Sequence, residues 1–141
     1  MSLWLPAVAV AAVISVLSAV PSPPSPGPEF PLKDKAGHLV LYAALGWTLR
    51  RASEGGVRVG GFGGGRGGGR GGGRFRRRAV LWAVLLATLH GAASELHQAL
   101  LPERTFELLD VLFDSVGAAI AQPLFFLGAK LRCRRARNCG G

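Results

Sequence analysis

Four long apolar blocks constrain this chain more than any other feature. A helix needs about 20 apolar residues to cross the hydrocarbon core of a bilayer. Three of the blocks reach or approach that length, and the shorter second block can cross if Lys35 and Arg50 snorkel to the two interfaces. The sequence therefore predicts an all-α integral membrane bundle of four transmembrane helices, at residues 1–20, 36–49, 79–101 and 108–129.

The distribution of positive charge predicts how these helices are oriented. The net charge is +9, but the basic residues are concentrated in two segments rather than spread over a surface. Residues 50–78 hold nine Arg and one Glu, and residues 130–141 hold five more basic side chains. Because basic loops stay on the cytoplasmic side, both termini are expected to be cytoplasmic. The Pro-rich loop 21–35 is then outside, whereas the Arg/Gly-rich loop 50–78 and the basic tail 130–141 are inside.

Three other segments have a simple expected role. The first apolar block lacks a basic n-region, so we expect a retained anchor helix and not a cleaved signal peptide. Cys133 and Cys139 lie in the predicted cytoplasmic tail, where thiols stay reduced. The Gly-Gly-Gly-Arg repeat between Gly63 and Arg74 could bind nucleic acid. We expect instead a flexible linker whose arginines touch anionic lipid head groups, with no nucleic-acid partner.

Polar residues inside the apolar blocks are the candidate functional groups. Ionisable side chains are costly in lipid and usually face a bundle interior. Residues three or four apart share one face of a helix, and this spacing recurs in three of the blocks. All these groups fall in the outer half, so we predict one polar pocket at the outer face, formed by Asp34, Lys35, His38, Tyr42, Glu95, Gln98, Arg104, Asp110 and Asp114.

The ordered set of polar residues resembles the VanZ-like family of small bacterial membrane proteins. The resemblance covers residues 33–129 and rests on Asp34-Lys35-x-x-His38-x-x-x-Tyr42, Glu95-x-x-Gln98, Pro102-x-Arg104 and Asp110-x-x-x-Asp114-x-x-Gly117. The family usually has Asn at the position of Asp114, and the Gly/Arg loop looks like an addition in this chain. The family name comes from a member linked to teicoplanin resistance. The resemblance implies a multipass protein of the bacterial cytoplasmic membrane, and it supplies no reaction.

We expect some of these polar residues to have a structural role and others to have a function. Buried polar groups in membrane bundles often only bond one another, and we assign this role to Tyr42 and Gln98. Unpaired buried charge must be neutralised or matched to a ligand, so Asp34, His38, Glu95 and Asp110 are expected to serve a function. His90 and His97 fall outside the family pattern and are treated as incidental.

Three classes of function remain open on the sequence alone. The first is binding of membrane lipids, with a lipid-linked envelope intermediate or a drug that targets one as the ligand. The second is an enzyme, with His38 as a general base oriented by Asp34 and Glu95 as an acid. The third is a small transporter. One His with several carboxylates could hold Mg²⁺, Mn²⁺ or Zn²⁺, but the spacing matches no dedicated motif, so no metal and no cofactor is predicted.

Overall fold

Four helices make up the fold. The computed structural model describes residues 3–20, 33–59, 71–101 and 105–138, and every regular element in these ranges is an α-helix. The predicted all-α class is therefore confirmed. The helices are α1 (Leu5–Ala19), α2 (Lys33–Val59), α3 (Gly71–Gln98) and α4 (Leu108–Asn138).

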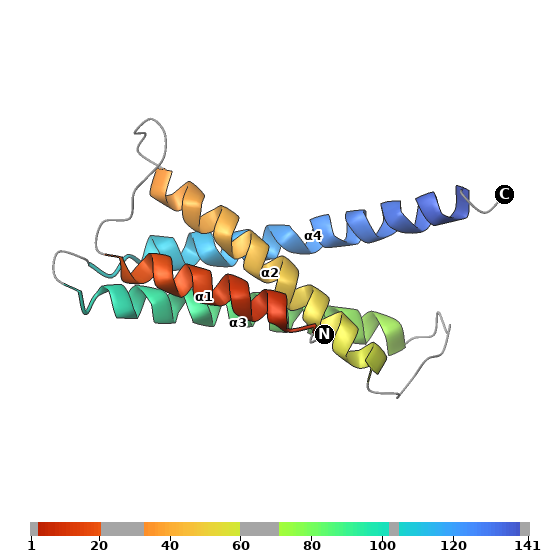
Figure 1. Ribbon diagram of the computed structural model, residues 1–141, viewed down its shortest axis with the longest axis horizontal. Helices are drawn as coiled ribbons and strands as arrows, with labels where there is room; N and C mark the ends of the chain where they lie inside the picture. Colours follow the sequence, from red (N-terminus) through yellow and green to blue (C-terminus); the bar gives the residue numbers. More distant parts are fainter. Residues whose placement is uncertain (1–2, 21–32, 60–70, 102–104, 139–141) are drawn as a thin grey trace.

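The helices alternate in direction along the chain. Figure 1 shows that the end of α1, the start of α2, the end of α3 and the start of α4 share one end of the bundle. We call this the polar end, because Lys35, Glu107 and Asp110 lie there. In the same view α2 crosses the other helices obliquely, and the C-terminal half of α4 leads away from the bundle. The alternation agrees with the up-and-down order that the charge pattern predicts.

Two of the helices are long and apolar enough to cross a membrane, among the residues that the structure describes. Their apolar ranges are Arg76–Gln98 and Leu108–Leu131, and α1 is a shorter apolar helix. Many large apolar side chains on their outer faces are exposed, including Leu81, Trp82 and Leu124. A bundle that turns such side chains outward is suited to lipid, because lipid does not penalise exposed apolar surface.

The helices run further than the apolar blocks, which corrects the predicted loop at residues 50–78. α2 continues from Leu49 to Val59, and α3 already begins at Gly71. Within the extension of α2, Arg50 bonds Glu54 one turn later at 2.5 Å, a pairing that stabilises a helix. Of the predicted loop 50–78, only residues 60–70 lie outside the described ranges.

Arg50, which the sequence analysis expects to snorkel to a membrane interface, is completely buried in the bundle at 0% exposure. Its guanidinium lies 4.7 Å from the ring centroid of Phe126 in α4. Arg76 of α3 lies over the same ring at 4.3 Å. Cations over aromatic faces are attracted by the ring quadrupole, so this stack joins three helices at the end opposite the polar end.

Small residues allow α2 and α4 to pack closely. A Cβ atom on Gly46 would lie 2.8 Å from Ala118 Cα, and one on Gly117 would overlap the carbonyl of Leu39. Small residues at a helix interface let the two backbones approach closely, and here they do so between α2 and α4. This contact brings the polar faces of the two helices together at the polar end.

Candidate functional site

The inward face of α2 carries Lys35, His38 and Tyr42, each of which contacts α3 or α4. At about 100° per residue, Lys35 lies only about 20° from the direction of Tyr42, whereas Asp34 lies about 80° away. Asp34 is accordingly exposed, and no bond from it to the other polar groups occurs among the described residues. The predicted stripe of Asp34, His38 and Tyr42 is therefore corrected to one that begins at Lys35.

Lys35 closes the polar end by joining α2 to the start of α4. Its Nζ donates to Glu107 Oε2 at 2.8 Å and to Asp110 Oδ1 at 2.7 Å. Both hydrogen bonds raise the pKa of Lys35 above its ordinary value, and the bond to Asp110 has the larger effect. The ammonium group is thus held in its charged form between two carboxylates.

His38 is oriented by Asp114. Its Nδ1 lies 2.9 Å from Asp114 Oδ1, and a carboxylate only accepts hydrogen bonds, so Nδ1 carries the hydrogen. Asp114 is completely buried at 0% exposure, and its other oxygen has no hydrogen-bond partner within the described ranges. The sequence had assigned the role of orienting His38 to Asp34, and the structure gives it to a residue 76 positions away.

Gly91 makes room for this pair on α3. A Cβ atom at this position would overlap the Asp114 carboxylate. The Asp114 side chain can therefore occupy the space between α2 and α3 only because residue 91 has no side chain.

Glu95 is buried nearby in α3, with 1% of its surface exposed. Its Oε2 accepts a bond from the backbone N–H of Glu107 at 3.3 Å. Its Oε1 has no hydrogen-bond partner among the described residues. A carboxylate oxygen buried without a partner is costly, so Glu95, like Asp114, is an incompletely satisfied group of the site.

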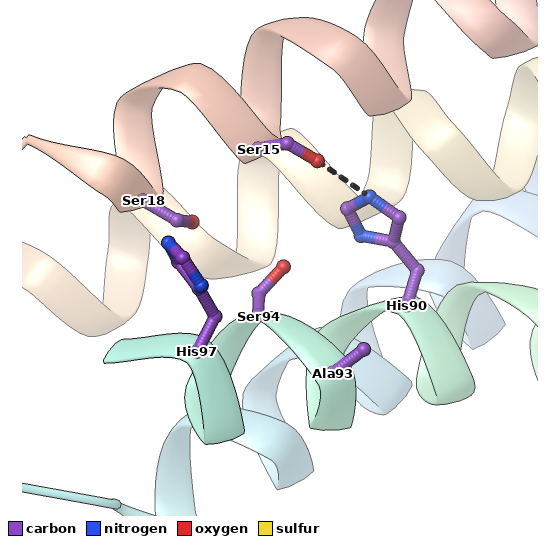
Figure 2. A pocket seen from close by; sticks show the side chains of 6 residues that line it. All are labelled: Ser15, Ser18, His90, Ala93, Ser94 and His97. Carbon is purple, nitrogen blue, oxygen red and sulfur yellow. Dashed lines mark hydrogen bonds between the residues drawn. The ribbon is translucent and has the colours of Figure 1, made fainter. Parts of the chain in front are cut away.

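A second branch of the network runs from Tyr42 of α2 through His90 of α3 to α1, and Figure 2 shows its last contact, between His90 and Ser15. The Tyr42 hydroxyl lies 3.1 Å from His90 Nδ1 and donates to Ser94 Oγ at 3.5 Å. His90 Nε2 in turn lies 3.2 Å from Ser15 Oγ. His90, treated as incidental from the sequence, is therefore a bridging residue. The signal that could have found it is its position four residues before Ser94, on the same face of α3.

A cavity of about 170 Å³ lies at this branch, between α1 and α3. Figure 2 shows hydroxyl and imidazole groups of both helices directed into it. Ser15, Ala93 and His97 are exposed, so the cavity opens at the surface of the bundle. The residues that line it are Ser15, Ser18, His90, Ala93, Ser94 and His97. Neither α1 nor His97 was part of the pocket predicted from the sequence.

The structure brings together six of the nine side chains proposed as one pocket: Lys35, His38, Tyr42, Glu95, Asp110 and Asp114. Gln98 is buried near the end of α3. Asp34 points away from the cluster, and Arg104 lies outside the described residues. Chemically, the assembled groups offer an imidazole, two partly unpaired carboxylates and one ammonium in a largely buried site.

Comparison with known proteins places the chain in a family. No curated protein and no solved structure matches it. The family model described as VanZ/LLP1 matches residues 10–128, a range that contains every residue of the polar cluster and most of α1. Together with the two helices long enough to span a bilayer, this match indicates a membrane protein. The chain belongs to the VanZ/LLP1 family.

Proposed function

We propose that this VanZ-like protein binds the polar head of a lipid-linked envelope intermediate at the outer face of the bacterial cytoplasmic membrane. Such binding would confer tolerance to a teicoplanin-type glycopeptide that targets the envelope. The observation that carries the proposal is the cavity between α1 and α3, which opens at the bundle surface beside the buried polar cluster.

The chemistry of the cavity favours a neutral, hydrogen-bonding ligand group. Three serine hydroxyls and two imidazoles line it, and hydroxyls and neutral imidazoles each both donate and accept. Sugar hydroxyls and amides present the same mixture. Drug-sized ligands occupy about 300 to 1,000 Å³, so a cavity of about 170 Å³ would hold one part of a head group while the lipid tail stays in the bilayer.

The topology that this function requires is four spans with both termini in the cytoplasm. The alternating helix directions and the basic residues near the end of α2 and the start of α3 support it. The polar end then faces the outside, where lipid-linked envelope intermediates are used.

Tolerance measurements with cavity-filling variants test the proposal. The full chain is expressed in a glycopeptide-sensitive bacterium, and Ala93→Phe is compared with Leu89→Phe, which places the same ring on an exposed outer position of α3. We expect the native chain and Leu89→Phe to raise the inhibitory concentration of teicoplanin, and Ala93→Phe to abolish the increase at equal membrane levels. Full tolerance with the cavity filled would contradict the proposal.

A second candidate function, an enzyme, is favoured by the His38–Asp114 pair. A base whose second nitrogen is fixed by a carboxylate is the usual arrangement for general acid–base catalysis. Purified protein would then turn over a lipid-linked substrate, and His38→Gln would lose this activity while still binding the substrate. Binding without turnover by the native protein would exclude this candidate.

A further inference from the structure

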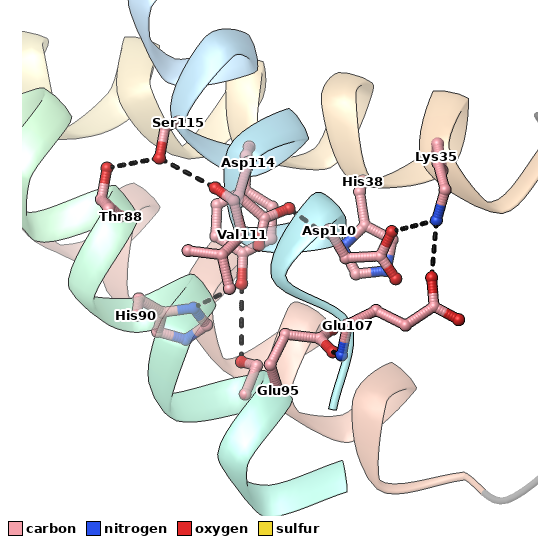
Figure 3. A network of polar contacts seen from close by, with 12 residues as sticks. Lys35, His38, Thr88, His90, Glu95, Glu107, Asp110, Val111, Asp114 and Ser115 are labelled. Carbon is pink, nitrogen blue, oxygen red and sulfur yellow. Dashed lines mark hydrogen bonds and ion pairs between the residues drawn. The ribbon is translucent and has the colours of Figure 1, made fainter. Parts of the chain in front are cut away.

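Three of the buried groups converge at one point from three different helices. One ligand atom each of His38 in α2, Glu95 in α3 and Asp110 in α4 lie within 4.8 Å of one another. These residues are between 15 and 72 positions apart in the chain, so only the packing of the bundle brings them together. Figure 3 shows their side chains meeting beside Lys35.

The convergence leaves buried negative charge without a matching donor. Glu95 is 1% exposed, and its Oε1 has no hydrogen-bond partner within the described ranges. Asp110 uses Oδ1 to bind Lys35, and its Oδ2 lies 3.9 Å from His38 Nε2. A separation of 3.9 Å is too long for a hydrogen bond. A buried carboxylate normally pairs with a cation or coordinates a metal.

His38 has the orientation of a metal ligand. Its Nδ1 is bonded to Asp114 Oδ1 at 2.9 Å, which leaves Nε2 on the side that faces Asp110. Metal-binding histidines almost always donate their other ring N–H to a carboxylate or carbonyl in this way, which fixes the ring and the tautomer. Asp114 therefore has the place of an outer partner that aims the ligand nitrogen at the site.

We propose that His38, Glu95 and Asp110 bind one divalent transition-metal ion of the Zn²⁺ or Mn²⁺ type. An imidazole disfavours Ca²⁺ and Mg²⁺, whereas it suits Zn²⁺ and its neighbours, and carboxylates extend the range to Mn²⁺. Zn²⁺ sites with three protein ligands keep an open position for water or another ligand. Ligand atoms about 2.1 Å from a tetrahedral ion are roughly 3.4 Å apart, so binding would draw the three groups together by about an ångström.

Metal binding to the full chain in detergent tests this site directly. After treatment with a chelator, the protein is titrated with Co²⁺, whose visible spectrum reports the ligands, and with Mn²⁺, followed by electron paramagnetic resonance. Competition with Zn²⁺ then gives the relative affinities. We expect one ion per chain and at least a tenfold loss of affinity in both Glu95→Gln and His38→Gln.

Two matched variants separate the site from other acidic groups. Asp34→Asn removes an exposed carboxylate that bonds none of the three ligands among the described residues, so the metal affinity of this variant should stay within about threefold of the native value. Asp114→Asn changes only the outer partner and should weaken binding by about 10- to 100-fold. The thermal unfolding temperature of each variant shows whether it is folded.

Either of two results would overturn the proposal. The first is that the native chain binds no ion. The second is that folded Glu95→Gln and His38→Gln have the same Co²⁺ spectra and affinities as the native protein. The site does not rest on the ligand-binding function proposed above, because metal content is measured without any lipid or antibiotic. Loss of tolerance in Ala93→Phe with unchanged metal binding would separate the two sites.

Discussion

His38 of α2 and Asp114 of α4 form the central contact of the polar end, with Nδ1 and Oδ1 2.9 Å apart. Asp114 is completely buried, and His38 is partly buried. The pair thus combines a helix–helix contact with a fixed orientation of the imidazole. The enzyme candidate and the proposed metal site both depend on that orientation of the His38 ring.

A double-mutant cycle on His38 and Asp114 should give a larger coupling energy than a neutral pair. We expect about 1.5 to 3 kcal/mol, because one partner is charged. The matched control is Thr88 and Ser115, whose hydroxyls lie 3.0 Å apart between α3 and α4, with an expected coupling of about 0.6 kcal/mol. The measurement is the free energy of unfolding in detergent of each single and double variant. All replacements are to Leu or Ala. Equal couplings would mean that the buried pair is not charge-assisted.

Gly91→Ala should destabilise the protein, although alanine is the better helix former. Its Cβ would overlap the carboxylate of Asp114, and overpacking typically costs about 1 to 3 kcal/mol. Gly37→Ala is the control, because a Cβ there meets nothing within 4 Å, and it should gain up to about 1 kcal/mol. Thermal unfolding of both variants checks this, and a neutral Gly91→Ala would show that Asp114 does not lie against α3.

Lys35 should stabilise the fold well into alkaline conditions, whereas Asp34 should contribute little. Because the pKa of Lys35 is raised above 10.5, its contribution is fully present below that ordinary value. It is lost as the pH rises through the higher native pKa. We expect Lys35→Met to lower the unfolding temperature at neutral pH and to flatten its alkaline decline, and Asp34→Asn to leave both unchanged. Thermal unfolding curves measured from neutral to alkaline pH test this prediction. Equal effects of the two variants would contradict the observation that Lys35, and not Asp34, faces the bundle interior.

Cysteine labelling should place the two ends of α2 on opposite sides of the membrane. In a chain with Cys133 and Cys139 replaced by serine, Asp34→Cys should react with an impermeant maleimide added outside intact cells. Glu54→Cys should react only after the cells are opened. The two positions lie near opposite ends of α2 (Figure 1). Reaction of both positions from outside would rule out four spans with cytoplasmic termini.

Several properties of the site could be predicted from the sequence because they depend on local spacing. Helical period places Lys35, His38 and Tyr42 together, and the family pattern marks Glu95, Asp110 and Asp114. The prediction failed for Asp34, because a strict four-residue spacing drifts around a helix of 3.6 residues per turn. It also missed His90 and Ser15, because neither residue belongs to the polar pattern on which the resemblance rests.

The helical class and the lengths of the apolar segments could be predicted from the amino-acid sequence, because both follow from residue types along a single segment. Which polar groups meet depends on the tertiary structure. Asp114 bonds His38, Lys35 bonds Asp110, and Glu95 lies close to His38 and Asp110. These partners are separated by 15 to 76 residues. Their distances depend on the close crossing of α2 and α4 at Gly46 and Gly117. No local pattern fixes that crossing, since it arises only when the backbones of two helices pack against each other.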